Sequence, residues 1–401
     1  IVDKGRILDL LATDQAYLKY QPHQIEKRLN HVLIPGLVNC HSHAAMSLLA
    51  GFADDLPLMD WLQNHIWPAE QKFVSEAFVR DGSDLAIAQM LRSGTTCFND
   101  MYFFPEVVAQ QAIQAGMRAN LGLIVFDFPT AWAKDPDEYF SKGLALYEQL
   151  RHQPLLSWSF APHAPYTVSD QPLQKLLSFA NELDLSVHMH VHETAFEVAD
   201  QTEKTGVSPL QRLNNLGLLS PSFIAVHMTQ LTEADINDFA ASGAHIVHCP
   251  ESNLKLASGF CPVAACLNAG INVALGTDGS ASNNDLDMLG EMRTAALLAK
   301  AVAGNAAVVS AAQALEMASL NGAKALGLEH EIGSLSIGKA ADVVAIDVAE
   351  IEAQPLFNPL SHIVYAASRH QISDVWVAGR QLLNQRQLTS IDLEDVKQRV
   401  A

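Results

Sequence analysis

The sequence predicts a (β/α)8 TIM barrel together with a small β-sandwich domain that is built from both chain ends. Between residues 33 and 335, eight apolar segments rich in Val, Ile, Leu or Phe alternate with helical patterns. The two ends, residues 1–32 and 336–401, contain short strand-like segments separated by glycine turns. With 401 residues, the chain is long enough for one large barrel and a small companion domain.

The candidate strands are short and apolar, as the buried strands of a parallel sheet are. Helical patterns lie between most of them, and several of these patterns stop at a glycine. An open doubly wound sheet is the alternative fold, but no Gly-x-Gly-x-x-Gly motif follows the first strand. The candidate strands cover 34–40, 95–100, 119–127, 155–162, 185–191, 223–228, 245–249 and 271–277, and the clearest helical patterns cover 76–92, 106–115, 170–183, 232–241 and 288–302.

The composition restricts the partners of the chain. Its net charge of −19 at pH 7 argues against binding to nucleic acid and to anionic membrane surfaces. No apolar run approaches the roughly 18 residues that a membrane-spanning helix needs. The five cysteines lie mostly in apolar runs, which is typical of reduced thiols in a cytoplasmic protein. The chain starts at Ile1 without a methionine or a signal peptide, so we expect natural residues upstream of it.

Two histidines at the end of the first candidate strand are the most informative feature. His41 and His43 close the apolar segment 33–43. Side chains two residues apart on a strand point to the same side, so the pair can converge at the carboxyl end of the strand. Barrels place their functional groups at this end, and paired imidazoles suit a divalent metal.

Three other strand ends carry further candidate ligands. The fifth strand presents His188, His190 and His192 on one face, and at least one of them is expected to be structural, with His190 deeper than His192. His227 ends the sixth strand, and Asp278 follows the eighth. Taken singly, His227 could be a core histidine and Asp278 a turn residue. The coincidence of such groups at four strand ends favours a shared metal site.

The motifs around these strand ends resemble those of the amidohydrolase superfamily. The resemblance covers essentially the whole chain, and finer motifs are similar to those of its 5′-methylthioadenosine/S-adenosylhomocysteine deaminase family. These finer motifs are WLQNHIWPAE at 61–70, NDMYF at 99–103, PHAPY at 162–166, HCPESNLKL at 248–256 and GTDGSASNN at 276–284.

The resemblance implies one divalent metal held by three histidines and one aspartate. The residues at the matching positions are His41, His43, His190 and Asp278. Zinc is the default metal for this donor set, and iron(II) would also fit. Superfamily members with two metals carry a lysine at the end of the fourth strand, whereas segment 155–163 of this chain has none.

The resemblance implies deamination of an adenine ring, and the following division of work among the residues is our hypothesis. Asp278 would take a proton from the activated water, and Glu193 would protonate ring N1 and then the departing amine. His227 would orient the water at the attacked carbon. Glu70 and His163 match substrate-binding positions, and a carboxylate such as Glu70 can accept hydrogen bonds from the vicinal ribose hydroxyls.

The expected substrate is an adenine nucleoside with a neutral 5′ group. Segment 126–136 has no arginine, and Lys134 is its only cation. We therefore expect 5′-methylthioadenosine and adenosine to be better substrates than S-adenosylhomocysteine, whose tail carries a carboxylate. Trp67 could pack on the nucleoside or could be a structural aromatic. The side chains expected around a methylthio group are Met46, Phe128 and Trp132.

Two alternative functions belong to different classes. Another aminohydrolase of this superfamily would act on guanine, 8-oxoguanine or triazines and would not need a sugar. A non-enzymatic relative would keep the barrel and lose the ligand set, which this sequence retains. We expect a small-molecule nucleoside substrate, no nucleic-acid or membrane partner and, from the resemblance, a homo-oligomer.

Overall fold

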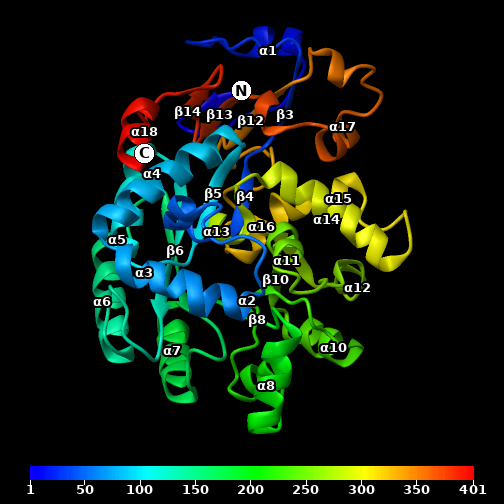
Figure 1. The fold of residues 1–401 in the computed structure, drawn as a ribbon. Helices are drawn as coiled ribbons and strands as arrows, with labels where there is room; N and C mark the ends of the chain where they lie inside the picture. Colours follow the sequence, from blue (N-terminus) through cyan, green and yellow to red (C-terminus); the bar gives the residue numbers. More distant parts are fainter.

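A computed structural model describes residues 1–401 and contains a barrel of parallel strands (Figure 1). Eight strands pair in chain order from β4 to β11. The Asp278 N–H donates to the His41 carbonyl at 3.0 Å, and a parallel bridge between Ser42 and Asp278 joins the last strand to the first. The (β/α)8 prediction is therefore confirmed, and the open sheet is excluded.

Each barrel strand lies within a few residues of its predicted segment. The strands are fully or almost fully buried, which agrees with their apolar composition. They are β4 (Leu37–Ser42), β5 (Thr95–Asp100), β6 (Arg118–Val125), β7 (Leu156–Pro162), β8 (Ser186–Val191), β9 (Phe223–His227), β10 (His245–His248) and β11 (Asn272–Leu275).

Helices between the strands cover the outside of the barrel (Figure 1). The Ser75 hydroxyl accepts the N–H of Phe78 at the start of α4, and Gly116, with φ of 77°, ends α5 in the left-handed conformation that glycine favours. The helices are α4 (Glu76–Arg92), α5 (Pro105–Ala115), α6 (Pro136–Leu150), α7 (Asp170–Leu183), α8 (Ala195–Thr205), α9 (Pro209–Asn215), α10 (Glu233–Ser242), α11 (Pro250–Lys255), α12 (Val263–Asn268), α13 (Ser280–Asn283), α14 (Met288–Ala303), α15 (Ala311–Met317) and α16 (Leu320–Ala325).

The connection between β4 and α4 is long and mostly helical. Glu70 lies in this connection, within a helix that begins with Trp67 and Pro68, and proline fits the first turn of a helix. The connection consists of a 3-10 helix (Ala44–Leu49), α2 (Leu58–Asp60), a π-helix (Trp61–Ile66) and α3 (Trp67–Phe73).

Both chain ends contribute to a second, antiparallel sheet, which confirms that the ends combine in one small β region, whereas its sandwich arrangement stays a prediction. Its strand order is β15-β14-β13-β12-β3, and both termini lie at this end of the molecule in Figure 1. The division into domains at residues 33 and 335 stays a prediction. The remaining strands and α-helices are β1 (Val2–Asp3), β2 (Arg6–Ile7), β3 (His31–Pro35), β12 (Val343–Asp347), β13 (Ile372–Val377), β14 (Arg380–Asn384), β15 (Gln387–Leu388), α1 (Thr13–Lys19), α17 (Pro359–Tyr365) and α18 (Leu393–Val400). None of the helices combines the length and the apolar character that crossing a membrane requires.

A buried ion pair joins the small sheet to the amino-terminal face of the barrel. Arg118, the first residue of β6, donates two hydrogen bonds of 3.1 Å to the two carboxylate oxygens of Asp342. Asp342 also accepts the backbone N–H of Ala378 at 2.7 Å. Both charged side chains are buried, so their mutual pairing compensates for the loss of water at this junction.

Candidate active site

Four side chains at the carboxyl ends of barrel strands converge on one point. One ligand atom from each of His41, His43, His190 and Asp278 lies within 4.8 Å of the others. Asp278 Oδ1 lies 3.3 Å from His41 Nε2 and 3.2 Å from His43 Nε2. His190 Nε2 lies 3.1 Å from His41 Nε2. We call these four residues the ligand cluster, and they occupy the positions that the family resemblance marks as metal ligands.

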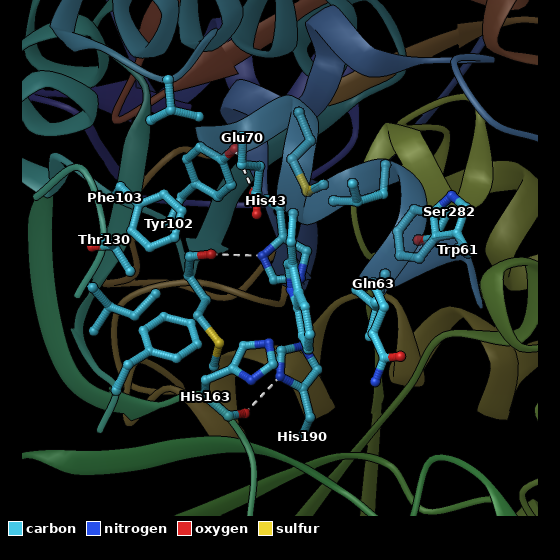
Figure 2. Close-up of a pocket in the computed structure, with 18 of the residues that line it drawn as sticks. His43, Trp61, Gln63, Glu70, Tyr102, Phe103, Thr130, His163, His190 and Ser282 are labelled. Atoms are coloured by element: carbon cyan, nitrogen blue, oxygen red, sulfur yellow. Dashed lines mark hydrogen bonds between the residues drawn. The ribbon is translucent and has the colours of Figure 1, made fainter. Parts of the chain in front are cut away.

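Backbone carbonyls orient two of the three imidazole rings. His43 Nδ1 donates to the Met101 carbonyl at 2.6 Å, and His190 Nδ1 donates to the His163 carbonyl at 2.7 Å (Figure 2). Because a carbonyl only accepts, each ring carries a proton on Nδ1 and directs Nε2 at the shared point. Three imidazoles and a carboxylate form a donor set that fits a divalent metal.

Buried polar side chains support the third ring from inside the barrel. His41 Nδ1 lies 3.0 Å from His188 Nε2, and the Asn99 amide nitrogen lies 3.2 Å from His188 Nδ1. Asn120 in turn donates to Asn99 Oδ1 at 2.8 Å and to the Ser159 hydroxyl at 2.9 Å. His188 is thus a support behind a member of the ligand cluster.

A left-handed turn after β8 separates His192 from the ligand cluster. His192 has φ of 52°, its Nδ1 donates to the Gln230 carbonyl at 2.7 Å, and its Nε2 accepts the Leu210 N–H at 3.1 Å. His227 and Asp278 also have positive φ, at 75° and 62°. Non-glycine residues hold this conformation only where their surroundings enforce it, and here such residues occur at three strand ends of the site.

Hydroxyl and backbone donors hold the Asp278 carboxylate. Its Oδ2 accepts from Ser252 at 2.7 Å and from Ser282 at 3.0 Å, and its Oδ1 accepts the Gly279 N–H at 2.8 Å. Burial raises the pKa of Asp278, but the rings of His41 and His43 outweigh burial and hold this pKa well below its usual value. The carboxylate is therefore ionised and fixed in orientation.

Glu193 and His227 lie beside the ligand cluster. Glu193 Oε2 is 3.8 Å from His227 Nε2, and His227 Nδ1 is 2.9 Å from the Asn253 amide nitrogen. Burial, followed by the carboxylates of Asp278 and Glu197, raises the pKa of Glu193 well above its usual value. Burial lowers the pKa of His227 to about 3. A proton-holding carboxyl and a neutral imidazole are suited to general acid–base chemistry.

A cavity of about 660 Å³ opens above these groups. Glu70, His163 and Trp67, which the sequence assigned to substrate, all line it together with the ligand-cluster residues His43 and His190. Figure 2 shows Glu70 and His163 on either side of His43. No lysine or arginine lines the cavity.

Glu70 is held by a residue to which the sequence analysis gave no role. The Tyr102 hydroxyl donates to Glu70 Oε1 at 2.8 Å (Figure 2). Burial raises the pKa of Glu70 to about 7, although the hydrogen bond from Tyr102 opposes this rise. No other hydrogen bond reaches the second carboxylate oxygen, which is left for a ligand in the cavity.

The apolar wall of the cavity differs in one residue from the expectation. Met46 and Phe128 line the cavity, and His163 stacks on Phe126 with ring centroids 4.7 Å apart. Trp132 does not line it. Its indole N–H donates to Glu106 at 3.1 Å and its ring is buried, so the assignment of Trp132 to a methylthio slot is wrong.

Several supporting residues could not be predicted individually. Ser252, Asn253, Ser282 and Tyr102 all lie in motifs that carry the family resemblance, so the motifs marked their positions. Their targets depend on how neighbouring strand ends face one another across the rim, which the linear spacing does not specify.

Comparisons with known proteins agree with this geometry. The family model described as "Amidohydrolase family" matches residues 32–382. A 5-methylthioadenosine/S-adenosylhomocysteine deaminase of Teredinibacter turnerae is 52% identical over 396 residues, which cover 99% of this chain and 90% of that protein. An adenosine deaminase from Xanthomonas campestris, crystallised with bound zinc, has a TM-score of 0.98 and 52% identity over 100% of this chain and 91% of that one. The guanine deaminase of E. coli shares the fold, with a TM-score of 0.87 at 23% identity, covering 96% of this chain and 92% of that one.

Proposed function

The chain belongs to the amidohydrolase family of metal-dependent hydrolases that act on C–N bonds, and we propose that it deaminates adenine nucleosides. The products would be the corresponding inosine analogue and ammonia. The observation that carries this proposal is the arrangement within one cavity: a metal-type ligand cluster and the proton-holding Glu193 lie at one side, and the carboxylate of Glu70 faces the same space.

The reacting groups would divide the work as follows. A divalent metal held by His41, His43, His190 and Asp278, with zinc the default, would lower the pKa of a bound water to about 7. Asp278 would accept the proton that the attacking water loses. Glu193 would protonate ring N1, which its raised pKa supports. The proton held by Asp278 would then pass through Glu193 to the leaving amine, and the proton of the C6 hydroxyl would return to Glu193 as the carbonyl forms.

His227, which lies beside Glu193, would contact the attacking water. Its neutral ring and the contact with Asn253 suit a role in orienting the water at C6 of the adenine ring. Because the Asn253 amide donates to Nδ1, the neutral ring carries its proton on Nε2 and can donate one hydrogen bond there without introducing a second positive charge next to the metal.

The nucleoside itself would be held by the cavity walls. Glu70, with one oxygen bound to Tyr102 and the other free, would accept hydrogen bonds from the ribose hydroxyls. His163 would contact the sugar or purine, and Trp67 would pack on the nucleoside. Aminohydrolases of guanine, 8-oxoguanine or triazines would have no use for a sugar-binding Glu70.

The 5′ substituent would be neutral. The carboxylate of S-adenosylhomocysteine would meet no lysine or arginine in the cavity, whereas a methylthio group would meet side chains such as Met46 and Phe128. An unmatched charge costs more than about 1.4 kcal/mol, so we expect kcat/KM at least about tenfold higher for 5′-methylthioadenosine than for S-adenosylhomocysteine. A homo-oligomeric state and a cytoplasmic location stay predictions of the sequence.

The test is a deamination panel combined with metal analysis. The purified protein is assayed on 5′-methylthioadenosine, adenosine, S-adenosylhomocysteine, free adenine, guanine and 8-oxoguanine. We expect the two neutral nucleosides to react fastest, with about one metal per chain, and chelation to abolish activity that zinc then restores. Faster reaction of free guanine or 8-oxoguanine would replace this proposal by the alternative aminohydrolase function.

A further inference from the structure

A second buried carboxylate, Glu197, lies behind the turn that carries Glu193. Glu197 Oε2 accepts the backbone N–H of Glu193 at 2.8 Å, and Oε1 accepts the backbone N–H of His192 at 3.2 Å. Glu197 is only 8% exposed and lies in the first turn of α8, whose preceding residue Thr194 caps the helix by accepting the Glu197 N–H at 3.2 Å.

This arrangement differs from an ordinary capping box. In that motif the third helical residue accepts the N–H of the capping residue itself. Here Glu197 reaches past Thr194 to the two residues before it. The carboxylate therefore joins the helix to the left-handed turn at His192, whose φ of 52° needs such support.

The rest of the turn is held from the neighbouring strand end. The Thr229 hydroxyl donates to the Glu193 carbonyl at 2.7 Å, and the Thr229 N–H donates to the His192 carbonyl at 3.0 Å. By contrast, the Glu193 carboxyl makes no hydrogen bond, and its one ion-pair contact is with His227 Nε2 at 3.8 Å. The direction of the Glu193 carboxyl is thus determined by its backbone rather than by hydrogen bonds of its own.

We propose that Glu197 is a positioning residue that acts through Glu193: its carboxylate fixes the turn at His192 and Glu193 and thereby aims the Glu193 carboxyl at the reacting ring. This inference rests on the proposed function, because it assigns Glu197 to the proton transfer that Glu193 performs there. Small misplacements of a reacting group are costly, and about 1 Å can reduce the rate roughly a hundredfold.

The first test is Glu197→Gln. Glutamine keeps one acceptor oxygen but turns an amide NH₂ toward a backbone N–H, so one anchor of the turn is lost. We expect kcat on the best nucleoside to fall by about 10- to 100-fold, with KM within about twofold and metal content unchanged. Glu203→Gln on the exposed side of α8 is the matched control and should keep the wild-type rate.

The second test places Glu197→Gln in the background of Glu193→Gln. If Glu197 acts through Glu193, the double variant reacts as slowly as Glu193→Gln alone, because the aimed group is already inactive. A further fall in the double variant, or a loss of metal that matches the loss of rate in Glu197→Gln, would overturn the inference. If Glu193→Gln itself keeps the wild-type rate, the role of Glu193 in the proposed function fails instead.

Discussion

Charged side chains are paired at the amino-terminal end of the barrel, whereas the Glu70 carboxyl lacks a charged partner at its carboxyl-terminal rim. At the amino-terminal junction, Arg118 and Asp342 satisfy each other with two hydrogen bonds, and Ala378 adds a third to the carboxylate. At the opposite rim, Glu70 has one hydrogen bond to its carboxylate and no basic partner. The difference indicates that the junction is built for stability, whereas the rim keeps carboxyl groups available for a ligand at a cost in stability.

The largest expected effect lies at the junction. Asp342→Asn leaves the buried Arg118 charge without its partner, and breaking one side of such a pair costs about 3–5 kcal/mol. We expect a clear fall in melting temperature, while kcat and KM of the folded protein stay close to those of the wild type. A large loss of kcat with an unchanged melting temperature would contradict the view that this junction serves stability and not activity.

At the carboxyl-terminal rim, a substitution should reduce the catalytic rate and not the stability. Glu193→Gln removes a general acid, which is typically worth about 10²–10⁴-fold, so turnover should fall at least about a hundredfold while metal stays bound. The change is measured by steady-state kinetics together with metal analysis of the same preparation. Near-normal turnover would refute the proton-transfer role of Glu193.

The cost of an unpaired rim carboxyl can be measured through Glu70. Burial raises its pKa from an ordinary value of 4.5 to about 7, so the folded state binds this proton more tightly than the unfolded state does. Its contribution to stability therefore falls as the pH rises through this window. At pH 8, Glu70→Gln should be more stable than wild type by up to roughly 3 kcal/mol, and near pH 4 the two should be equal.

Melting temperatures of both proteins at several pH values give this comparison. The sign is opposite to that expected for Asp342→Asn, which makes the pair of variants a direct measure of the difference between rim and junction. A lower melting temperature for Glu70→Gln at pH 8 would mean that Glu70 is a stabilising residue.

The smallest expected effect concerns Tyr102. Tyr102→Phe removes one hydrogen bond to Glu70, worth about 1–1.5 kcal/mol, so KM for ribose-bearing substrates should rise roughly 5- to 10-fold with kcat largely retained. With a 2′,3′-dideoxy substrate the variant and the wild type should have equal KM. An equal loss on both substrates would show that Tyr102 does not act through a sugar contact of Glu70.

Sequence patterns predicted the barrel well because its strands are buried on both faces and its helices end at local signals such as Gly116. They also predicted candidate ligands at four strand ends, and the family resemblance selected His41, His43, His190 and Asp278 from these candidates. Contacts between side chains across the rim are not specified by the linear sequence pattern. The hydrogen bond of Tyr102 to Glu70 and the turning of Trp132 away from the cavity both depend on side-chain packing in three dimensions.

The closure of the barrel has a consequence for the apo protein. The first and last strands meet where the Asp278 N–H donates to the His41 carbonyl, and both residues also belong to the ligand cluster. A bound cation would thus link the first and last strands at the place where the barrel closes. Amide hydrogen exchange at this junction of the two strands should slow when the metal binds. The exchange rate there therefore reports how much of the metal site is filled, without any substrate.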